Sequence, residues 1–164
     1  MILLQPWNKG IRALLTILVL LWVGYVFTNS LVPASQSSAI SGGVVGQLNS
    51  MLHQIGIPME VTDHIVRKSA HFIEFTLLGI LLFLTIRSYS PHPGRHLFVG
   101  LFLGLLIPVA DEFIQLFVEG RGSQVSDVVL DFGGILTGTI LFFLFFFLAT
   151  HKKRRAARWK HLAS

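Results

Sequence analysis

Hydrophobic positions in this chain gather into four long runs instead of alternating with polar ones. The runs cover residues 11–31, 69–86, 97–117 and 128–150. Each approaches the ~20 apolar residues that an α-helix needs to cross a bilayer. Composition agrees, because hydrophobic residues make up 52% of the chain and charged residues only 13%, against about 25% charged in soluble domains. The pattern predicts an all-α integral membrane protein with four transmembrane helices.

The long first connection, residues 32–68, carries a helical pattern of its own. Apolar residues recur at helical spacing from Val44 to Ile55, which predicts an interfacial amphipathic helix on the extracytoplasmic membrane surface. The preceding stretch, 33-PASQSSAISGG-43, has the composition of a flexible linker, and 56-GIP-58 should end the helix. A plain loop covering the bundle is the alternative.

The distribution of lysine and arginine predicts the orientation of the chain. With the N-terminus in the cytoplasm, most basic residues lie inside, namely Lys9, Arg12, Arg87, Arg95 and the run 152-KKRRAARWK-160. Only Arg67, Lys68 and Arg121 then lie outside. We therefore expect a single four-helix transmembrane domain over residues 1–150, a basic cytoplasmic tail over residues 151–164, and cytoplasmic termini. A cleaved signal peptide is the alternative for the first run, although that run exceeds the usual length of such segments.

The net charge of +5 arises largely from the basic tail. A basic run beside a transmembrane segment is an ordinary anchor near anionic lipids, so no nucleic-acid partner is expected. The chain has no cysteine, which excludes disulfides, thiolate nucleophiles and cysteine metal sites. Gly100 with Gly104, and Gly134 with Gly138, have the spacing that lets transmembrane helices approach closely.

Ionisable side chains enter the outer halves of three of the four predicted spans. The inner halves are nearly all apolar, as in 140-ILFFLFFFLA-149, and the first span has nothing comparable. The residues concerned are Arg67, Lys68, His71 and Glu74 in the second span, Asp111, Glu112, Gln115 and Arg121 at the end of the third, and Asp127 and Asp131 at the start of the fourth. Arg67, His71 and Glu74 share a helix face. If these spans pack together, we expect the bases to face the acids in one outward-facing pocket.

Two interpretations of this convergence remain open. The charges can form a network that fixes helix register, or they can line a ligand-binding pocket. Charged groups inside a membrane are costly, which favours the pocket. The candidates for acid or base catalysis are His71, Glu74, Asp111 and Glu112, but no serine lies in a nucleophile motif. We expect no cofactor and no metal, because Arg67 and Lys68 would oppose a cation.

Three motifs occur in order within residues 64–138: R-K-x-A-H-F-x-E-F followed by L-L-G, then D-E-x-x-Q-x-F, then G-R-G-S-x-x-S-D-V. This combination resembles the VanZ-like family of bacterial membrane proteins, named for a protein that lowers susceptibility to teicoplanin. The resemblance implies a multi-pass protein of the bacterial cell membrane. The motif positions that it carries over are Arg67, Lys68, His71, Glu74, Glu112, Gln115, Arg121 and Asp127. Asp131 stands where the family pattern has asparagine, and Glu119 where it often has proline.

The pocket and the resemblance together predict a protein of the bacterial cell envelope. It would bind or modify an envelope lipid or a cell-wall precursor and lower susceptibility to teicoplanin-type glycopeptides. Besides the lipid bilayer, the expected partner is a lipid-linked cell-wall intermediate or the glycopeptide antibiotic. Whether the protein is an enzyme stays open. The alternative is a structural partner of another membrane protein, with the charges serving only helix register. No oligomeric state is predicted.

Overall fold

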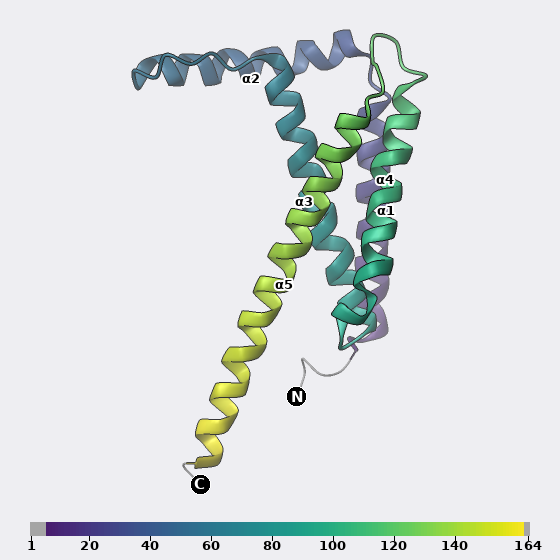
Figure 1. Cartoon of the computed structure of the whole chain (residues 1–164), viewed down its shortest axis with the longest axis vertical. Helices are drawn as coiled ribbons and strands as arrows, with labels where there is room; N and C mark the ends of the chain where they lie inside the picture. Colours follow the sequence, from purple (N-terminus) through teal and green to yellow (C-terminus); the bar gives the residue numbers. More distant parts are fainter. Residues whose placement is uncertain (1–5, 163–164) are drawn as a thin grey trace.

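The computed structural model describes residues 6–162, with side chains as far as Lys152. The elements in chain order are α1 (Lys9–Ser30), α2 (Ala34–Gln54), α3 (Asp63–Tyr89), the short 3-10 helix η2 (Pro93–His96), α4 (Leu97–Gln115) and α5 (Val125–Leu162). The described residues include no β-strand. α1, α3, α4 and α5 run along one another as a bundle, whereas α2 lies across one end of it (Figure 1). The start of α1 and the end of α5 lie at the other end.

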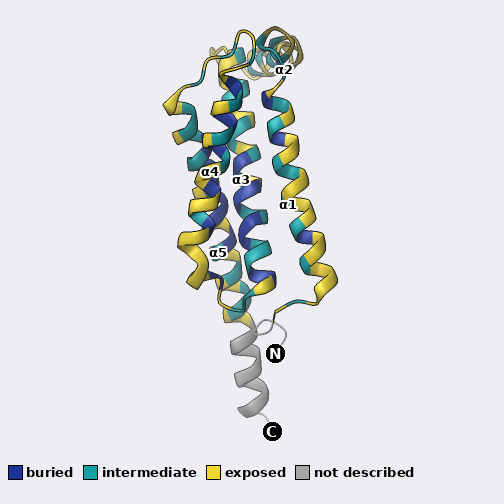
Figure 2. Ribbon diagram, turned by 90° about the vertical axis from the view of Figure 1, so that its right-hand side faces the viewer, coloured by how far each residue is buried: buried dark blue, intermediate teal, exposed yellow. Residues whose placement is uncertain are grey.

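Four helices are long and apolar enough to cross a membrane, which confirms the predicted fold class. These spans are Lys9–Ser30, Asp63–Tyr89, Pro93–Gln115 and Val125–Lys152. Large apolar side chains cover the outside of the bundle, and Leu20, Phe98 and Phe145 are 65%, 82% and 73% exposed. Figure 2 shows this exposure along α1 and the outer faces of α4 and α5. Lipid tails are the environment that suits such a surface, since water would penalise an apolar patch of this size.

α2 is longer than the sequence pattern predicted. It begins at Ala34 after Pro33, so residues 34–43 are helical and the flexible-linker prediction is wrong. Serine and glycine are weak helix formers, but here Ser38 and Ser41 donate hydrogen bonds to Asp63 at the start of α3. These contacts hold the segment in place. The helix ends before Gly56, whose φ of 74° is readily adopted only by glycine, and this confirms the predicted break. That α2 lies on a membrane surface stays a prediction.

The centre of the bundle is the contact between α3 and α5. A methyl group added at Gly134 would lie 2.7 Å from the Phe72 carbonyl oxygen, and one added at Gly138 would collide with the Thr76 carbonyl oxygen. Gly79 gives the same close approach from the α3 side, 2.6 Å from the Ile135 carbonyl oxygen. The two backbones therefore meet directly, as small residues allow between transmembrane helices.

The second predicted span ends at residue 86, which would leave Arg87 in the connection after it, but Arg87 belongs to the last turn of α3. The helix continues to Tyr89 because the first helix-breaking residue is Pro91. Arg87 is only 2% exposed, and its guanidinium carbon lies 5.7 Å from the ring of Trp7 and 5.6 Å from that of Phe146. Aromatic faces attract a cation at this distance, so this arginine helps to close the end of the bundle away from α2.

Candidate functional site at the α2 end of the bundle

A polar cavity of about 180 Å³ opens at the end of the bundle where α2 lies. It is formed by the first turns of α3 and α5, the last turn of α4 and the connection between α4 and α5. The lining residues are His64, Arg67, Lys68, His71, Glu112, Gln115, Gly120, Arg121, Gly122, Gln124, Asp127, Leu130 and Asp131. The structure thus places most of the residues singled out in the sequence around one cavity.

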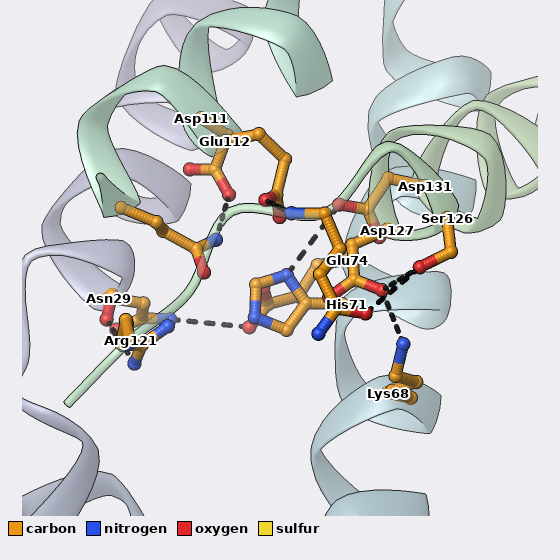
Figure 3. A network of polar contacts seen from close by, with 12 residues as sticks. Asn29, Lys68, His71, Glu74, Asp111, Glu112, Arg121, Ser126, Asp127 and Asp131 are labelled. Carbon is orange, nitrogen blue, oxygen red and sulfur yellow. Dashed lines mark hydrogen bonds and ion pairs between the residues drawn. The ribbon is translucent and has the colours of Figure 1, made fainter.

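Two polar pairs join α3 to α5 across this cavity. The Lys68 ammonium group contacts the Asp127 carboxylate in an ion pair. One turn further along both helices, His71 Nδ1 lies 3.9 Å from Asp131 Oδ2. Figure 3 shows both pairs at the same side of the cluster. Their positions follow from helical periodicity, since each pair lies about one turn from the other on both helices.

The carboxylates of α4 lie deeper in the bundle. Asp111 is fully buried, and its Oδ2 accepts a hydrogen bond of 2.9 Å from Gln115 Nε2. The Ser30 hydroxyl lies beside Asp111, but neither Ser30 Oγ nor Asp111 Oδ1 has a well-formed hydrogen bond among the described residues. Glu112 Oε2 accepts from the backbone N–H of Gln124 at 2.9 Å, which ties the end of α4 to the start of α5.

Arg121 binds backbone carbonyl groups at the end of α1 and just beyond it, and it forms no ion pair with a carboxylate of the described residues. Its Nε donates to the Val32 carbonyl oxygen at 2.8 Å and its Nη2 donates to the Asn29 carbonyl oxygen at 3.2 Å. Arg121 therefore fastens the connection between α4 and α5 to the C-terminal end of α1, where backbone carbonyl groups accept hydrogen bonds from side chains. Burial lowers the pKa of the Arg121 guanidinium from its ordinary value, and repulsion from Arg67 acts in the same direction.

Arg67 pairs within its own helix, with Arg67 Nε 3.3 Å from Asp63 Oδ2. Asp63 also accepts hydrogen bonds from Ser38 and Ser41 of α2. This carboxylate therefore joins α2 to the rim of the cavity. Sequence reasoning passed over Asp63, although its spacing of four residues from Arg67 was a signal that could have found it.

Glu74 lies on the α1 side of the cluster. Its Oε1 accepts a hydrogen bond of 3.2 Å from Asn29 Nδ2. Glu74 and Asn29 line a second cavity of about 310 Å³, which shares Arg67, His71 and Arg121 with the first. The first span brings no ionisable side chain to this cluster, as the sequence indicates, but the polar end of α1 contributes the uncharged amide of Asn29. An uncharged amide at a span end gives no strong sequence signal.

The sequence predicted that the basic residues would face the acidic residues of the pocket, and the structure confirms this only in part. Lys68 faces Asp127 as expected, but Arg67 and Arg121 have other partners. Local geometry decides both cases, because Asp63 lies one turn from Arg67 and the α1 carbonyl groups lie beside Arg121. The result is a cluster in which Asp111 and Glu112 have no lysine or arginine within ion-pair distance among the described residues.

Comparison with known proteins gives one result for this chain. The model of the family described as VanZ/LLP1 matches residues 15–147, which run from within α1 to within α5 and include every residue of the cluster. The search of curated proteins and the search of solved structures each found no match. The match covers most of the chain and extends beyond the motif region on which the sequence resemblance rested.

Proposed function

Because the chain belongs to the VanZ/LLP1 family, we propose that its polar cavity binds the anionic headgroup of an envelope lipid or of a lipid-linked cell-wall precursor. The observation that carries this proposal is that Arg67, Lys68 and Arg121 all line one cavity. The side chains of Arg67 and Lys68 remain 34% and 30% exposed, so both can reach a ligand. Guanidinium and ammonium groups are suited to bind phosphate oxygens.

The size of the cavity favours a headgroup over a whole antibiotic. Sites for drug-sized ligands usually enclose about 300–1,000 Å³, whereas this cavity has about 180 Å³. A phosphate group fits such a space with the lipid chains left in the bilayer. A glycopeptide such as teicoplanin is larger than the usual drug-sized ligand, so an effect on susceptibility would act through the bound lipid.

The proposed orientation places this cavity at the outer face of the bacterial cell membrane. Lys9, Arg12, Arg95 and Lys152 lie at the opposite end of the spans, and such an excess of basic residues favours the cytoplasmic side. The cavity would then meet lipids of the outer leaflet, where exported cell-wall precursors are used.

A structural role for the same charges has its own support. The pairs Lys68–Asp127 and His71–Asp131 both connect α3 to α5, as a register network would. Under this second proposal the protein assembles with another membrane protein, and substitutions in the cavity that preserve folding leave its function intact.

Lipid binding to the purified full chain tests the first proposal. The wild type in detergent would be titrated with phosphatidylglycerol, with phosphatidylcholine and with a polyprenyl phosphate, and thermal stability would be followed. We expect the anionic lipids alone to raise the unfolding temperature. Arg67→Gln should weaken their apparent affinity about tenfold, which corresponds to 1.4 kcal/mol and is typical of a charged hydrogen bond.

Arg95→Gln is the matched control, since Arg95 is exposed and lies in η2 at the other end of the bundle. It should leave lipid binding unchanged. Equal stabilisation by phosphatidylcholine, or equal losses from Arg67→Gln and Arg95→Gln, would show that the cavity does not select anionic headgroups.

A further inference from the structure

Three side chains from three helices converge at the floor of the cavity. They are His71 of α3, Asp111 of α4 and Asp131 of α5, and one ligand atom of each lies within 4.8 Å of those of the other two. Figure 3 shows His71 between Arg121 on one side and Asp127 and Asp131 on the other, with Asp111 above Arg121. Asp111 is 0% exposed and Asp131 is 1% exposed.

The basic residues around this cluster are engaged elsewhere. Lys68 pairs with Asp127 and Arg67 pairs with Asp63. Arg121 binds the carbonyl oxygen of Asn29 in α1 and that of Val32 just after it. The objection that Arg67 and Lys68 would repel a cation is therefore weaker than the sequence suggested, because a carboxylate faces each of them.

Each aspartate is only partly satisfied, since Asp111 Oδ2 accepts a hydrogen bond from Gln115 and Asp131 Oδ2 lies 3.9 Å from His71 Nδ1. Oδ1 of Asp111 and Oδ1 of Asp131 have no hydrogen-bond partner among the described residues. No lysine or arginine of the described chain forms an ion pair with either residue. Buried carboxylates without compensation cost several kcal/mol each, so two of them side by side favour the binding of a proton or of a cation.

We propose that His71, Asp111 and Asp131 bind a divalent cation at the floor of the cavity. One such ion would balance two carboxylates and occupy their open oxygen atoms. An imidazole nitrogen with two carboxylate oxygens suits Zn²⁺ or Mn²⁺, whereas Mg²⁺ and Ca²⁺ prefer oxygen ligands alone. Ligand atoms of a tetrahedral zinc site lie roughly 3.4 Å apart, so these side chains would draw together by on the order of 1 Å on binding.

The ion would have a coordination position open toward the cavity. His71 and Asp131 line the cavity, whereas Asp111 lies behind them. Three protein ligands with one open position are typical of zinc sites that bind an exogenous ligand. Metal binding does not depend on the lipid proposed above, so either proposal can fail while the other holds.

Metal content of the purified full chain tests this site. The protein would be prepared without a polyhistidine tag, stripped with EDTA, incubated with Zn²⁺ or Mn²⁺ and passed through a desalting column before elemental analysis. We expect the wild type to retain one ion per chain and to unfold at a higher temperature with metal than without. His71→Gln and Asp131→Asn should each weaken binding by at least about tenfold, since even outer-shell changes cost 10–100-fold in metal sites.

His53→Gln is the matched control, because His53 is exposed in α2 and lies outside the cluster. It should bind metal as the wild type does. Binding that is absent from the wild type, or equal in wild type, His71→Gln and Asp131→Asn, would overturn the proposal. If the variants do not fold, X-ray absorption spectroscopy of the zinc-loaded wild type tests the site by identifying the ligand atoms. One imidazole among oxygen ligands supports the site, whereas two or more imidazoles contradict it.

Discussion

Arg121 Nη2 donates a hydrogen bond of 3.2 Å to the carbonyl oxygen of Asn29, a residue 92 positions earlier in the chain. The same side chain also binds the Val32 carbonyl oxygen through Nε. One guanidinium thus joins the connection between α4 and α5 to the end of α1. Arg121 therefore both lines the cavity and fastens the end of α1 beside it.

Arg121→Gln should lower the free energy of unfolding by about 2 kcal/mol, because it removes two charged hydrogen bonds to backbone carbonyl oxygens. Arg121→Lys should recover only part of this loss, since an ammonium group lacks the planar fork that reaches two acceptors. Thermal or denaturant unfolding in detergent measures both. Full recovery with lysine would mean that charge alone matters, and Arg95→Gln provides the baseline for losing an exposed arginine.

Gly134→Ala should destabilise the contact between α3 and α5. The added methyl group would lie 2.7 Å from the Phe72 carbonyl oxygen, and overpacking of this kind costs about 1–3 kcal/mol. Gly24→Ala is the matched control, because nothing lies within 4 Å of the added methyl group in α1. The unfolding temperatures of the two variants are compared in the same detergent, and that of Gly134→Ala should be the lower. Similar values would show that the two helices do not meet as closely as described.

The Lys68–Asp127 pair should contribute modestly to stability. The two side chains are 30% and 26% exposed, so we expect a coupling energy of roughly 0.2–1 kcal/mol, as for partly exposed ion pairs. A double-mutant cycle with Lys68→Met and Asp127→Asn measures it. A coupling well above this range would favour the register network over the binding pocket.

Cysteine labelling tests the proposed orientation, since the natural chain has no thiol of its own. Glu119 and His92 are exposed at opposite ends of the bundle. In intact cells, Glu119→Cys should react with a membrane-impermeant maleimide, whereas His92→Cys should react only after permeabilisation. The reverse labelling pattern would place the cavity on the cytoplasmic side and remove the basis for a role at the cell surface.

Glycopeptide susceptibility tests the physiological role. In a Gram-positive host, we expect the wild type to raise the inhibitory concentration of teicoplanin more than that of vancomycin. Glu74→Gln and Arg67→Gln should abolish this protection at matched membrane levels, because both residues line the polar cavities. Protection by all three proteins would leave the charges with a structural role only. No protection by the wild type would show that the resistance role does not apply to this chain.

The membrane spans were predictable because their signal is long and additive. About twenty consecutive apolar residues identify a span whatever surrounds it, and the close approach at Gly134 and Gly138 followed from their spacing. The full length of α2 was not predictable in this way. Its first residues are weak helix formers, and contacts of Ser38 and Ser41 with Asp63 hold them in the helix.

The residues around the cavity were also easier to predict than their partners. Ionisable residues are conspicuous in an otherwise apolar span, and Arg67, His71 and Asp131 were identified in this way. The partner of Arg121 is a pair of backbone carbonyl groups, which every residue possesses and no sequence pattern reveals. The partner of Arg67 is Asp63, four residues earlier on its own helix, which the sequence prediction did not include.

The glycine contacts also determine how the cavity can move. Two helices whose backbones are in contact cannot slide along each other without first separating. The carbonyl groups of one helix would collide with the next turn of the other. α3 and α5 should therefore move as one rigid unit, which keeps the backbones of His71 and Asp131 at a fixed distance from each other. α4 packs less extensively on both and contains Pro108, a residue that weakens the helix at that point. The cavity should therefore open and close by tilting of α4 relative to α3 and α5. Such a tilt would move Asp111 and Glu112 toward or away from His71 and Asp131.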